Sequence, residues 1–306
     1  MSPRWCWLLL AACPLLLQQP PPSGAKPARA QPHRSPADVA LLPGGRLALT
    51  ANHTADSASL VDLAEGKALA ELPCGRKPAG VAVSADGRRA AVSNLWSDSL
   101  SLFEIDGNRL RPLGEVPVGH QPRGLAFAPD GRSLFADLAG GDEVAQLDWA
   151  SREVTRRLPA PREPRQVVLT KDGKQLIAAS MRSSQVRCWD AATGKLVWER
   201  AINDSFNLLG LALTPDGQDV VTTQVHTRHH PIIKHNIEQG WALNSRVARM
   251  SLRPDADRSY TQIALDVRNK AVGDPTAVAF TQAGDVLAVV AAGTQEVLLV
   301  QSEAIP

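Results

Sequence analysis

One phrase recurs along this chain at a nearly constant spacing. Gly124–Arg132 is an alternating apolar run that ends in a Pro-Asp-Gly turn, and a second apolar run follows it directly. Pro129 fixes φ, Asp130 can bond its own backbone and Gly131 tolerates positive φ, so the phrase predicts a β-hairpin. Related phrases occur at Gly80–Arg88, Gln166–Lys174, Leu209–Gln218, Val39–Arg46 and Thr276–Asp285.

The spacing of these hairpins predicts the architecture. Successive turn glycines are 42, 44, 42, 44 and 67 residues apart, at Gly45, Gly87, Gly131, Gly173, Gly217 and Gly284. A period near 43 with a hairpin in each unit is typical of the four-stranded blade of a β-propeller, and no helical periodicity competes with it. We therefore expect an all-β propeller of about six visible blades, part of a seven-bladed ring, with one insertion in the long interval.

The second unit gives the clearest expectation for one blade. Its strands are predicted at Gly80–Ser84, Ala90–Asn94, Ser99–Ile105 and Leu110–Pro117. Inner strands should be rich in small and branched apolar residues because neighbouring blades bury them, whereas outer strands should admit charge.

The first residues predict export. Residues 1–30 have a basic start, a short apolar core and small residues at Ala28 and Ala30, which is the pattern of a secretory signal peptide. Leu10-Ala-Ala-Cys13 offers an alternative, a lipoprotein signal in which Cys13 is acylated, and this is the one membrane attachment we expect. The expected location is the periplasm, the cell surface or the medium, and residues 31–306 form the propeller.

Charge and cysteine content exclude several classes. The formal net charge is +2 and basic residues are scattered, so we expect no nucleic-acid partner. Without the leader, Cys74 and Cys188 remain, at different positions of different repeats, and a disulfide is not expected. No Cys-x-x-Cys-His occurs, so the chain should bind no covalent haem, and we expect no cofactor in it.

The connections between units repeat as well, and end in proline at residues 78, 122, 164 and 275. In a propeller such links gather on one face around the channel. The expected result is a mostly basic channel rim, which either keeps the turns soluble or attracts anions, formed by Arg76, Lys77, His120, Arg123 and Arg165.

Taken together, the Pro-Asp-Gly-Arg turns, strands such as Ala91-Val-Ser-Asn94, the Ser59–Asp62 type of third strand and the Gly-x-x-Pro links resemble the YVTN-repeat β-propellers across Ala37–Val300. That family includes exported surface proteins, relatives of the cytochrome-type nitrite reductase propeller, lactonase-like enzymes, and propellers attached to di-haem cytochrome c peroxidase modules. Fold alone does not select one of these functions.

The insertion is expected as a loop over residues 224–250 of the fifth unit. It holds four of the seven histidines, an excess of three positive charges and Trp241, which is the composition of a docking surface. His226, Gly240-Trp241 and Asn244 resemble an insertion of the peroxidase-associated propellers, which implies a c-type cytochrome or di-haem peroxidase module as partner and haem on that partner. The expected partner-binding residues are His226, Arg228, His229, His230, His235, Trp241, Asn244 and Arg246, and the four histidines are weak candidates for metal ligands.

Two functions therefore stay open. The first is an exported, non-catalytic propeller that presents its loop to a protein partner, and the second is a lactonase-like hydrolase acting at the channel mouth. No Gly-x-Ser-x-Gly elbow, His-Glu-x-x-His motif or paired carboxylates at the rim mark a catalytic centre, so no catalytic residue is assigned. The sixth unit lacks a fourth strand before Pro306, and we expect the natural chain to continue.

Overall fold

The computed structural model describes residues 33–227, 231, 233–238, 243–256, 260–266 and 271–305. All of these residues belong to the compact unit His33–Pro306. The predicted signal peptide and Cys13 lie outside the described residues, so export and lipidation remain predictions.

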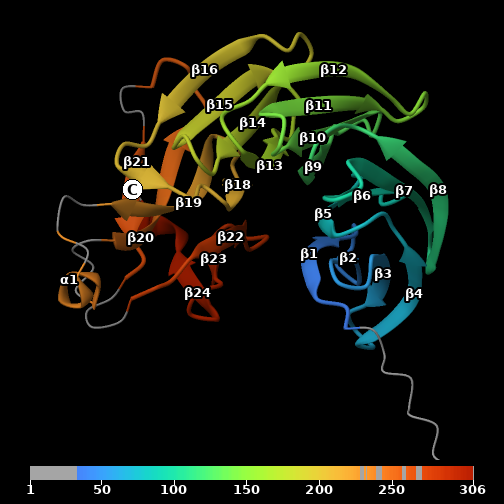
Figure 1. The fold of residues 1–306 in the computed structure, drawn as a ribbon, viewed down its shortest axis with the longest axis horizontal. Coiled ribbons are helices and arrows are strands. Elements are labelled where there is room, and N and C mark those ends of the chain that lie inside the picture. The colour runs from blue at the N-terminus through green and yellow to red at the C-terminus, as the bar shows by residue number, and fades with distance from the viewer. Residues whose placement is uncertain are drawn as a thin grey trace, which may run out of the picture. The chain divides into compact units, whose positions relative to one another are not determined.

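Six antiparallel sheets follow one another along the chain, and Figure 1 shows them arranged about a common centre. Blade one comprises β1 (Pro36–Leu41), β2 (Leu47–Asn52), β3 (Ser57–Asp62) and β4 (Lys67–Pro73). Blade two comprises β5 (Pro78–Val83), β6 (Arg89–Asn94), β7 (Ser99–Asp106) and β8 (Arg109–Pro117). Blade three comprises β9 (Pro122–Phe127), β10 (Ser133–Leu138), β11 (Glu143–Asp148) and β12 (Glu153–Pro159).

The later blades are less regular. Blade four comprises β13 (Pro164–Leu169), β14 (Gln175–Ser180), β15 (Gln185–Asp190) and β16 (Leu196–Ala201). Blade five has five strands, because β17 (Ser205–Phe206) and β18 (Leu211–Leu213) both pair with β19 (Asp219–Thr227), and β20 (Leu243–Ser251) and β21 (Thr261–Ala264) complete the sheet. Blade six has three described strands, β22 (Pro275–Phe280), β23 (Val286–Ala291) and β24 (Glu296–Gln301), before the short helix η1 (Ser302–Ala304).

The predicted β-propeller is confirmed. In blade two every strand boundary lies within two residues of its expected place. A polarity gradient is present in blade three: the second strand β10 is buried along nearly its whole length, whereas in the outer strand β12 exposed residues alternate with partly or fully buried ones. The sequence periodicity therefore corresponds to real blades with a solvated outer edge.

The core consists of five clusters, one between each pair of consecutive blades among the described residues. Between blades one and two, for example, Leu49 and Leu60 pack with Val92 and Phe103. Burial of such side chains, each stabilising by roughly 1.5–3 kcal/mol, holds the sheets face to face with no disulfide among the described residues. Cys74 and Cys188 are free, and burial raises the pKa of each thiol to about 12.

Because successive strands run in opposite directions, the connections between them lie alternately on two faces of the propeller. The Pro-Asp-Gly turns lie on one face, which we call the hairpin face. The links between blades, together with the turns between second and third strands, lie on the other face, which we call the link face. Both predicted site regions, the channel rim and the insertion, belong to the link face.

The insertion is shorter than expected from the sequence. Strands β19 and β20 extend into it with residue-by-residue pairing as far as Thr227 and Leu243. The connection between them contains a short helix, α1 (Lys234–Glu238). Within the described part of the chain, no helix is long and apolar enough to cross a membrane.

Candidate functional site

The links that lead into blades two, three and four share one local structure. The residue before the proline has a left-handed backbone: φ is 55° at Lys77, 54° at Gln121 and 54° at Glu163. This conformation is disfavoured for residues other than glycine. A carboxylate from the preceding blade offsets the cost by accepting the backbone N–H, in the pairs Lys77–Asp56 (2.7 Å), Gln121–Asp98 (2.9 Å) and Glu163–Asp142 (2.7 Å).

Arg76 and Lys77, two of the predicted rim residues, pack against an exposed tryptophan that the sequence analysis did not select. The Arg76 guanidinium carbon and the Lys77 Nζ each lie 5.5 Å from the ring centroid of Trp96, which is 57 % exposed. Backbone bonds from Leu95 and Trp96 to the Lys77 and Arg76 carbonyls fix the turn that carries the ring. We call Arg76, Lys77 and Trp96 the aromatic patch.

His120, a third predicted rim residue, is engaged by an acid. Its Nδ1 lies 3.2 Å from Asp98 Oδ2, and its ring packs against Gly140, where a Cβ would come within 2.2 Å of the ring. The backbone N–H of Gln121, followed by His120, holds the pKa of Asp98 below its usual range despite partial burial. His120 therefore contributes to the turn and adds little uncompensated charge to the rim.

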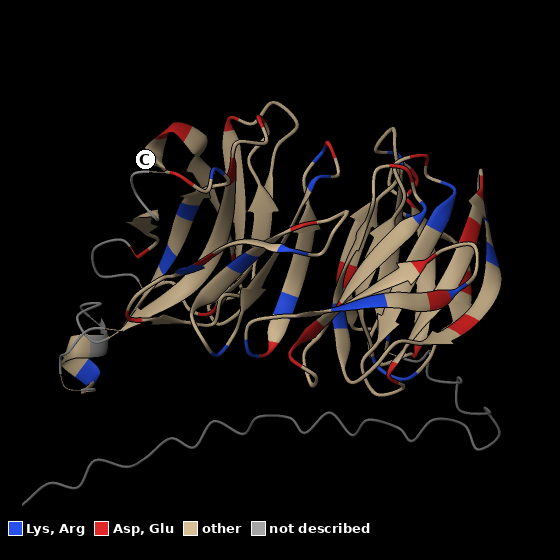
Figure 2. Cartoon of the chain, turned by 90° about the horizontal axis from the view of Figure 1, so that it is seen from above, with Lys and Arg blue, Asp and Glu red and all other residues tan. Residues whose placement is uncertain are grey.

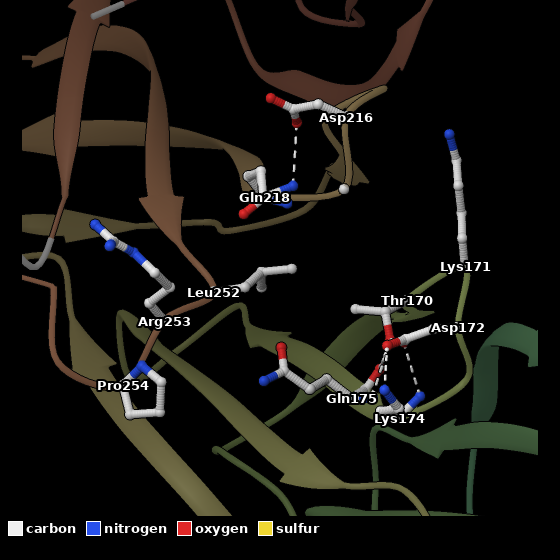
Figure 3. Close-up of a pocket in the computed structure, with 11 residues that line it drawn as sticks. Thr170, Lys171, Asp172, Lys174, Gln175, Asp216, Gln218, Leu252, Arg253 and Pro254 are labelled. Carbon is white, nitrogen blue, oxygen red and sulfur yellow. Dashed lines mark hydrogen bonds and ion pairs between the residues drawn. The ribbon is translucent and has the colours of Figure 1, made fainter.

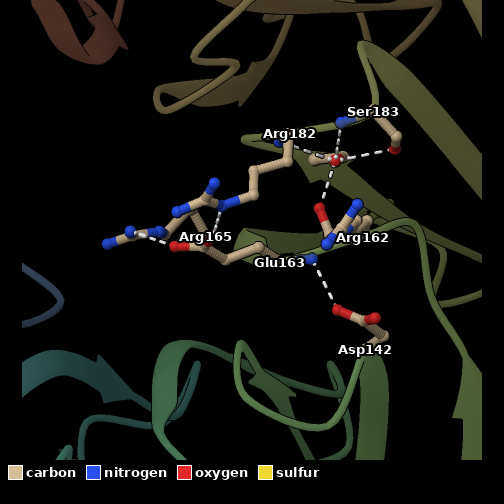
Figure 4. Close-up of polar contacts among 7 residues, drawn as sticks. Asp142, Arg162, Glu163, Arg165, Arg182 and Ser183 are labelled. Carbon is tan, nitrogen blue, oxygen red and sulfur yellow. Dashed lines mark hydrogen bonds and ion pairs between the residues drawn. The ribbon is translucent and has the colours of Figure 1, made fainter.

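Arg123 and Arg165 are the two remaining residues of the predicted rim. They follow Pro122 and Pro164 at the start of the neighbouring inner strands β9 and β13. Figure 4 shows Arg165 and Arg182 converging on the carboxylate of Glu163, which forms an ion pair with each of them. Ser180 Oγ accepts the backbone N–H groups of Arg182 (3.1 Å) and Ser183 (2.8 Å), which fixes the turn that carries Arg182.

Arg123, which belongs to the neighbouring blade three, adds a third arginine to this group. Burial and the positive charge of Arg165 lower the pKa of Arg123, while Asp137 and Glu163 oppose this effect. Its Nε and that of Arg165 are buried without hydrogen-bond partners among the described residues. We call Arg123, Asp137, Glu163, Arg165 and Arg182 the arginine cluster.

Asp137 occupies a repeated position of the fold. In blades two, three and five, the inner strand has glycine at this level and the second strand has a polar side chain that accepts its N–H: Ser93 for Gly80, Asp137 for Gly124 and Thr223 for Gly210. In blades one and four the positions are exchanged, because Asp38 and Gln166 stand on the inner strand opposite alanine.

Asp137 differs from its second-strand counterparts Ser93 and Thr223 in being ionisable. The residue is fully buried, and its Oδ2 accepts the Gly124 N–H at 3.0 Å while its Oδ1 has no partner among the described residues. Burial raises the pKa of Asp137 well above its ordinary value, and the Gly124 N–H and the two arginines oppose the shift without cancelling it.

The structure places the predicted partner-binding residues unevenly. Arg228, His229, His230 and Trp241 lie outside the described residues, as does Gly240. His226 and Asn244 are opposite each other in the β19–β20 ladder, and Arg246 donates from Nε to Asn244 Oδ1 at 2.8 Å. Asn244 is buried, so it belongs to the sheet and not to an exposed loop as predicted, whereas His235 is exposed on α1.

A mainly apolar cavity of about 300 Å³ lies beside the base of the insertion. Asp266 closes one side by accepting the N–H groups of Ser245 (3.0 Å) and Val272 (2.6 Å), and burial raises its pKa. The cavity is lined by blade five and by the link to blade six, including Phe206, Val225, Leu243, Asn244, Val272 and Asp274.

Two grooves on the hairpin face are architectural. One lies between the Thr170–Gln175 turn of blade four and the Asp216–Gln218 turn of blade five, and Figure 3 shows both turns with Leu252 and Arg253 beside them. An equivalent groove lies between blades one and two. In the former, Thr170 Oγ1 donates to Asp172 Oδ1 at 2.7 Å, and this bond lowers the pKa of Asp172. Because the same groove recurs at another junction, we assign it to the repeat and not to a specific site.

No cluster of three or more potential metal-ligating side chains occurs among the described residues, which omit His229 and His230. Charges of both signs are interspersed along the strands and turns, as Figure 2 shows. The arginine cluster is thus notable for its burial and unpaired polar atoms rather than for a broad basic field.

Comparisons with known proteins support the propeller. The family model described as "Lactonase, 7-bladed beta-propeller" matches residues 70–155, which include β9 and β10 with Arg123 and Asp137. Hydrazine synthase of Kuenenia stuttgartiensis has a similar solved structure, with a TM-score of 0.82 and 25% identity over 92% of this chain and 80% of that chain. A search of curated proteins by sequence found no match.

Sequence reasoning thus selected Arg123 and Arg165 but did not select Asp137, Glu163, Arg182 or Trp96. Asp137 could have been noticed as an ionisable residue inside the apolar run Leu134–Ala139. Glu163 and Arg182 carry no comparable signal, because their approach to Arg165 depends on how a link and a turn fold toward each other.

Proposed function

We propose that the protein is an exported binding propeller that docks a protein partner on its link face. The aromatic patch carries this proposal, because it combines an exposed indole with two cations packed against it, on two backbone segments that hydrogen bonds join. Tryptophan and arginine are the side chains most enriched at the energetic centres of protein interfaces. Preorganisation lowers the entropy cost of binding, and the two cations favour an acidic partner surface.

The partner class that we favour is a c-type cytochrome or a di-haem peroxidase module. It is suggested by the sequence resemblance of His226, Gly240-Trp241 and Asn244 to the insertion of peroxidase-associated YVTN propellers. The connection after β19 belongs to the link face, as does the aromatic patch, so one partner could engage both. Haem would then belong to the partner.

The test uses Trp96→Ala and Trp241→Ala with a purified c-type cytochrome or peroxidase module encoded next to this protein. Trp96→Ala should weaken binding by about 2 kcal/mol, roughly 30-fold, because an exposed interface aromatic contributes on that scale. Its melting temperature should change little, since the ring is largely outside the core. Isothermal titration calorimetry and a melting curve measure the two quantities.

Leu196→Ala serves as the control, because Leu196 is 54% exposed on the outer strand of blade four. Unchanged affinity in both tryptophan variants would contradict docking on the link face. A loss in Trp241→Ala alone would restrict the interface to the insertion, and a lowered melting temperature without loss of affinity would make the tryptophan structural.

A second candidate function is lactone hydrolysis at the channel mouth. It is favoured by the family match, whose segment contains Arg123 and Asp137 of the arginine cluster. A buried carboxyl with a raised pKa can transfer a proton, and the arginines could stabilise the oxyanion of ring opening. Turnover of simple lactones that disappears in Asp137→Asn would support the enzyme, and absence of turnover in the native protein would remove this candidate.

A further inference from the structure

The arginine cluster carries more positive charge than its own acids balance. Glu163 pairs with Arg165 and Arg182, and Arg123 adds a third guanidinium with no ion pair among the described residues. Arg165 and Glu163 are each about one-fifth exposed, so solvent compensates these charges only in part. Half-buried guanidinium groups with open N–H donors are the usual binding groups for planar oxyanions.

Asp137 could in principle neutralise one of the arginines, but its place in the fold argues for the neutral acid. Its counterpart Ser93 accepts the Gly80 N–H and donates to the Arg123 carbonyl oxygen of the next blade at 2.6 Å. Asp137 accepts the Gly124 N–H in the same way, and the equivalent carbonyl oxygen of Arg165 lies beside Gly124. A protonated Asp137 can donate as Ser93 does, which satisfies its otherwise unpartnered Oδ1.

With Asp137 neutral, three guanidinium groups face one carboxylate. The excess amounts to two positive charges, concentrated where Arg123 and Arg165 start neighbouring inner strands. Repulsion between these two arginines is the second-largest influence on the Arg123 pKa, after burial. A bound anion offsets the free-energy cost of this repulsion, so a fold can retain the two arginines side by side.

We propose that the arginine cluster binds a small soluble oxyanion, through a carboxylate or phosphate group held between Arg123 and Arg165. Glu163 acts as the positioning residue, because its carboxylate holds Arg165 and Arg182 on one side and leaves their remaining donors for the ligand. Asp137 anchors the inner strands of blades three and four and contributes no charge. The site lies on the link face, where the side chain of Arg182 is 62% exposed, so a soluble ligand can reach it from solvent.

The test measures binding of succinate and of inorganic phosphate to the full chain by isothermal titration calorimetry, at pH 7 and fixed ionic strength. At least one probe should bind saturably with one site per chain. Arg123→Ala should weaken that binding about tenfold or more, because a charge-assisted bond is lost. Arg123→Lys should keep part of the affinity, since it retains the charge but loses the planar fork.

Arg132→Ala is the matched control, because Arg132 is an exposed arginine of the same blade on the opposite, hairpin face. It should bind the probes as the native protein does. Succinate binding alone identifies a carboxylate ligand, and phosphate binding alone identifies a phosphorylated one.

Absence of saturable binding of both probes would overturn the proposal, as would equal affinity of native and Arg123→Ala proteins. An equal loss in Arg132→Ala would also overturn it, because the effect would then reflect net charge. Arg123→Ala removes no side-chain hydrogen bond among the described residues, and a melting curve checks that it is folded. The inference does not depend on protein docking, so the Trp96→Ala result leaves it untouched.

Discussion

At the scale of single residues, Asp137 shows how a repeated position can acquire new properties. Ser93 and Thr223 fill the same place with hydroxyl groups, which donate and accept without carrying charge. An aspartate there preserves the bond to the inner-strand glycine but places an ionisable group in the core. The fold tolerates it because the neutral acid has the same donor and acceptor pattern as a hydroxyl.

Asp137→Asn should therefore flatten the pH dependence of stability. The folded pKa of Asp137 is raised well above the unfolded value of about 3.9, so the folded protein binds more protons than the unfolded chain in that interval. Its contribution to the free energy of unfolding is complete below about pH 4 and is lost as pH rises toward the folded pKa. Asparagine keeps the hydrogen bonds and cannot ionise.

Urea unfolding of both proteins at pH 4, 6 and 8 measures this effect. The variant should gain stability relative to the native protein as pH rises, while the other carboxylates contribute equally to both and cancel. Parallel curves across the three pH values would show that Asp137 is charged in the folded protein. The charge balance proposed for the arginine cluster would then be wrong.

At the scale of elements, the blades are joined by close contact of inner strands. At each contact a glycine or a polar side chain of one blade lies against the backbone of the next blade. Where the first strand has glycine, the second strand has the polar side chain, and where the first strand has the polar side chain, the second strand has alanine. A Cβ added at Gly80 would lie 2.0 Å from the Arg123 carbonyl oxygen, and one at Gly124 would lie 2.7 Å from the Gln166 Cα. Glycine is required here for space and not for its backbone angles.

Gly80→Ala should accordingly destabilise the protein by about 2 kcal/mol or more, because two backbone segments must separate. The melting temperature should fall by several degrees. Gly141→Ala is the matched control, since its Cβ would meet nothing closer than 3.8 Å. Comparable melting temperatures for the two variants would contradict the close packing of inner strands.

At the scale of the whole molecule, the first and last blades each leave an apolar face uncovered. Val39 and Leu41 are exposed on β1, and Val297 and Leu299 are exposed on β24, with Leu299 reaching 72%. In Figure 1 these two blades lie on either side of a sector without described strands. The matching family has seven blades. We propose that a seventh sheet covers both faces in the functional protein.

The 306-residue chain alone should therefore self-associate in a concentration-dependent manner, because association buries these exposed apolar sheet faces. The double variant Val297→Lys, Leu299→Lys should reduce the association measured by sedimentation velocity. Leu196→Lys, at a similarly exposed site on the outer strand of blade four, should not. A monomer at every concentration, or an equal effect of Leu196→Lys, would show that these faces need no cover.

The sequence was sufficient to predict the strands and hairpins, because these depend on local residue patterns. Pro129-Asp-Gly131 and its repeats define hairpins through backbone preferences, and the alternation in runs such as Ala90–Asn94 defines which face is buried. The constant period then implies stacked blades. The sequence also predicted one rim for Arg123 and Arg165, because they follow equivalent prolines, and this stays a prediction.

Only the tertiary structure decided which of the rim charges remain uncompensated. His120 is engaged by Asp98 and Arg165 by Glu163, whereas Arg123 forms no ion pair among the described residues. These outcomes depend on the rotation of neighbouring blades and on the paths of their links, which bring together residues far apart in the chain. No local pattern encodes such distances, so the burial of Asp137 beside the arginines could be seen only once the blades were packed.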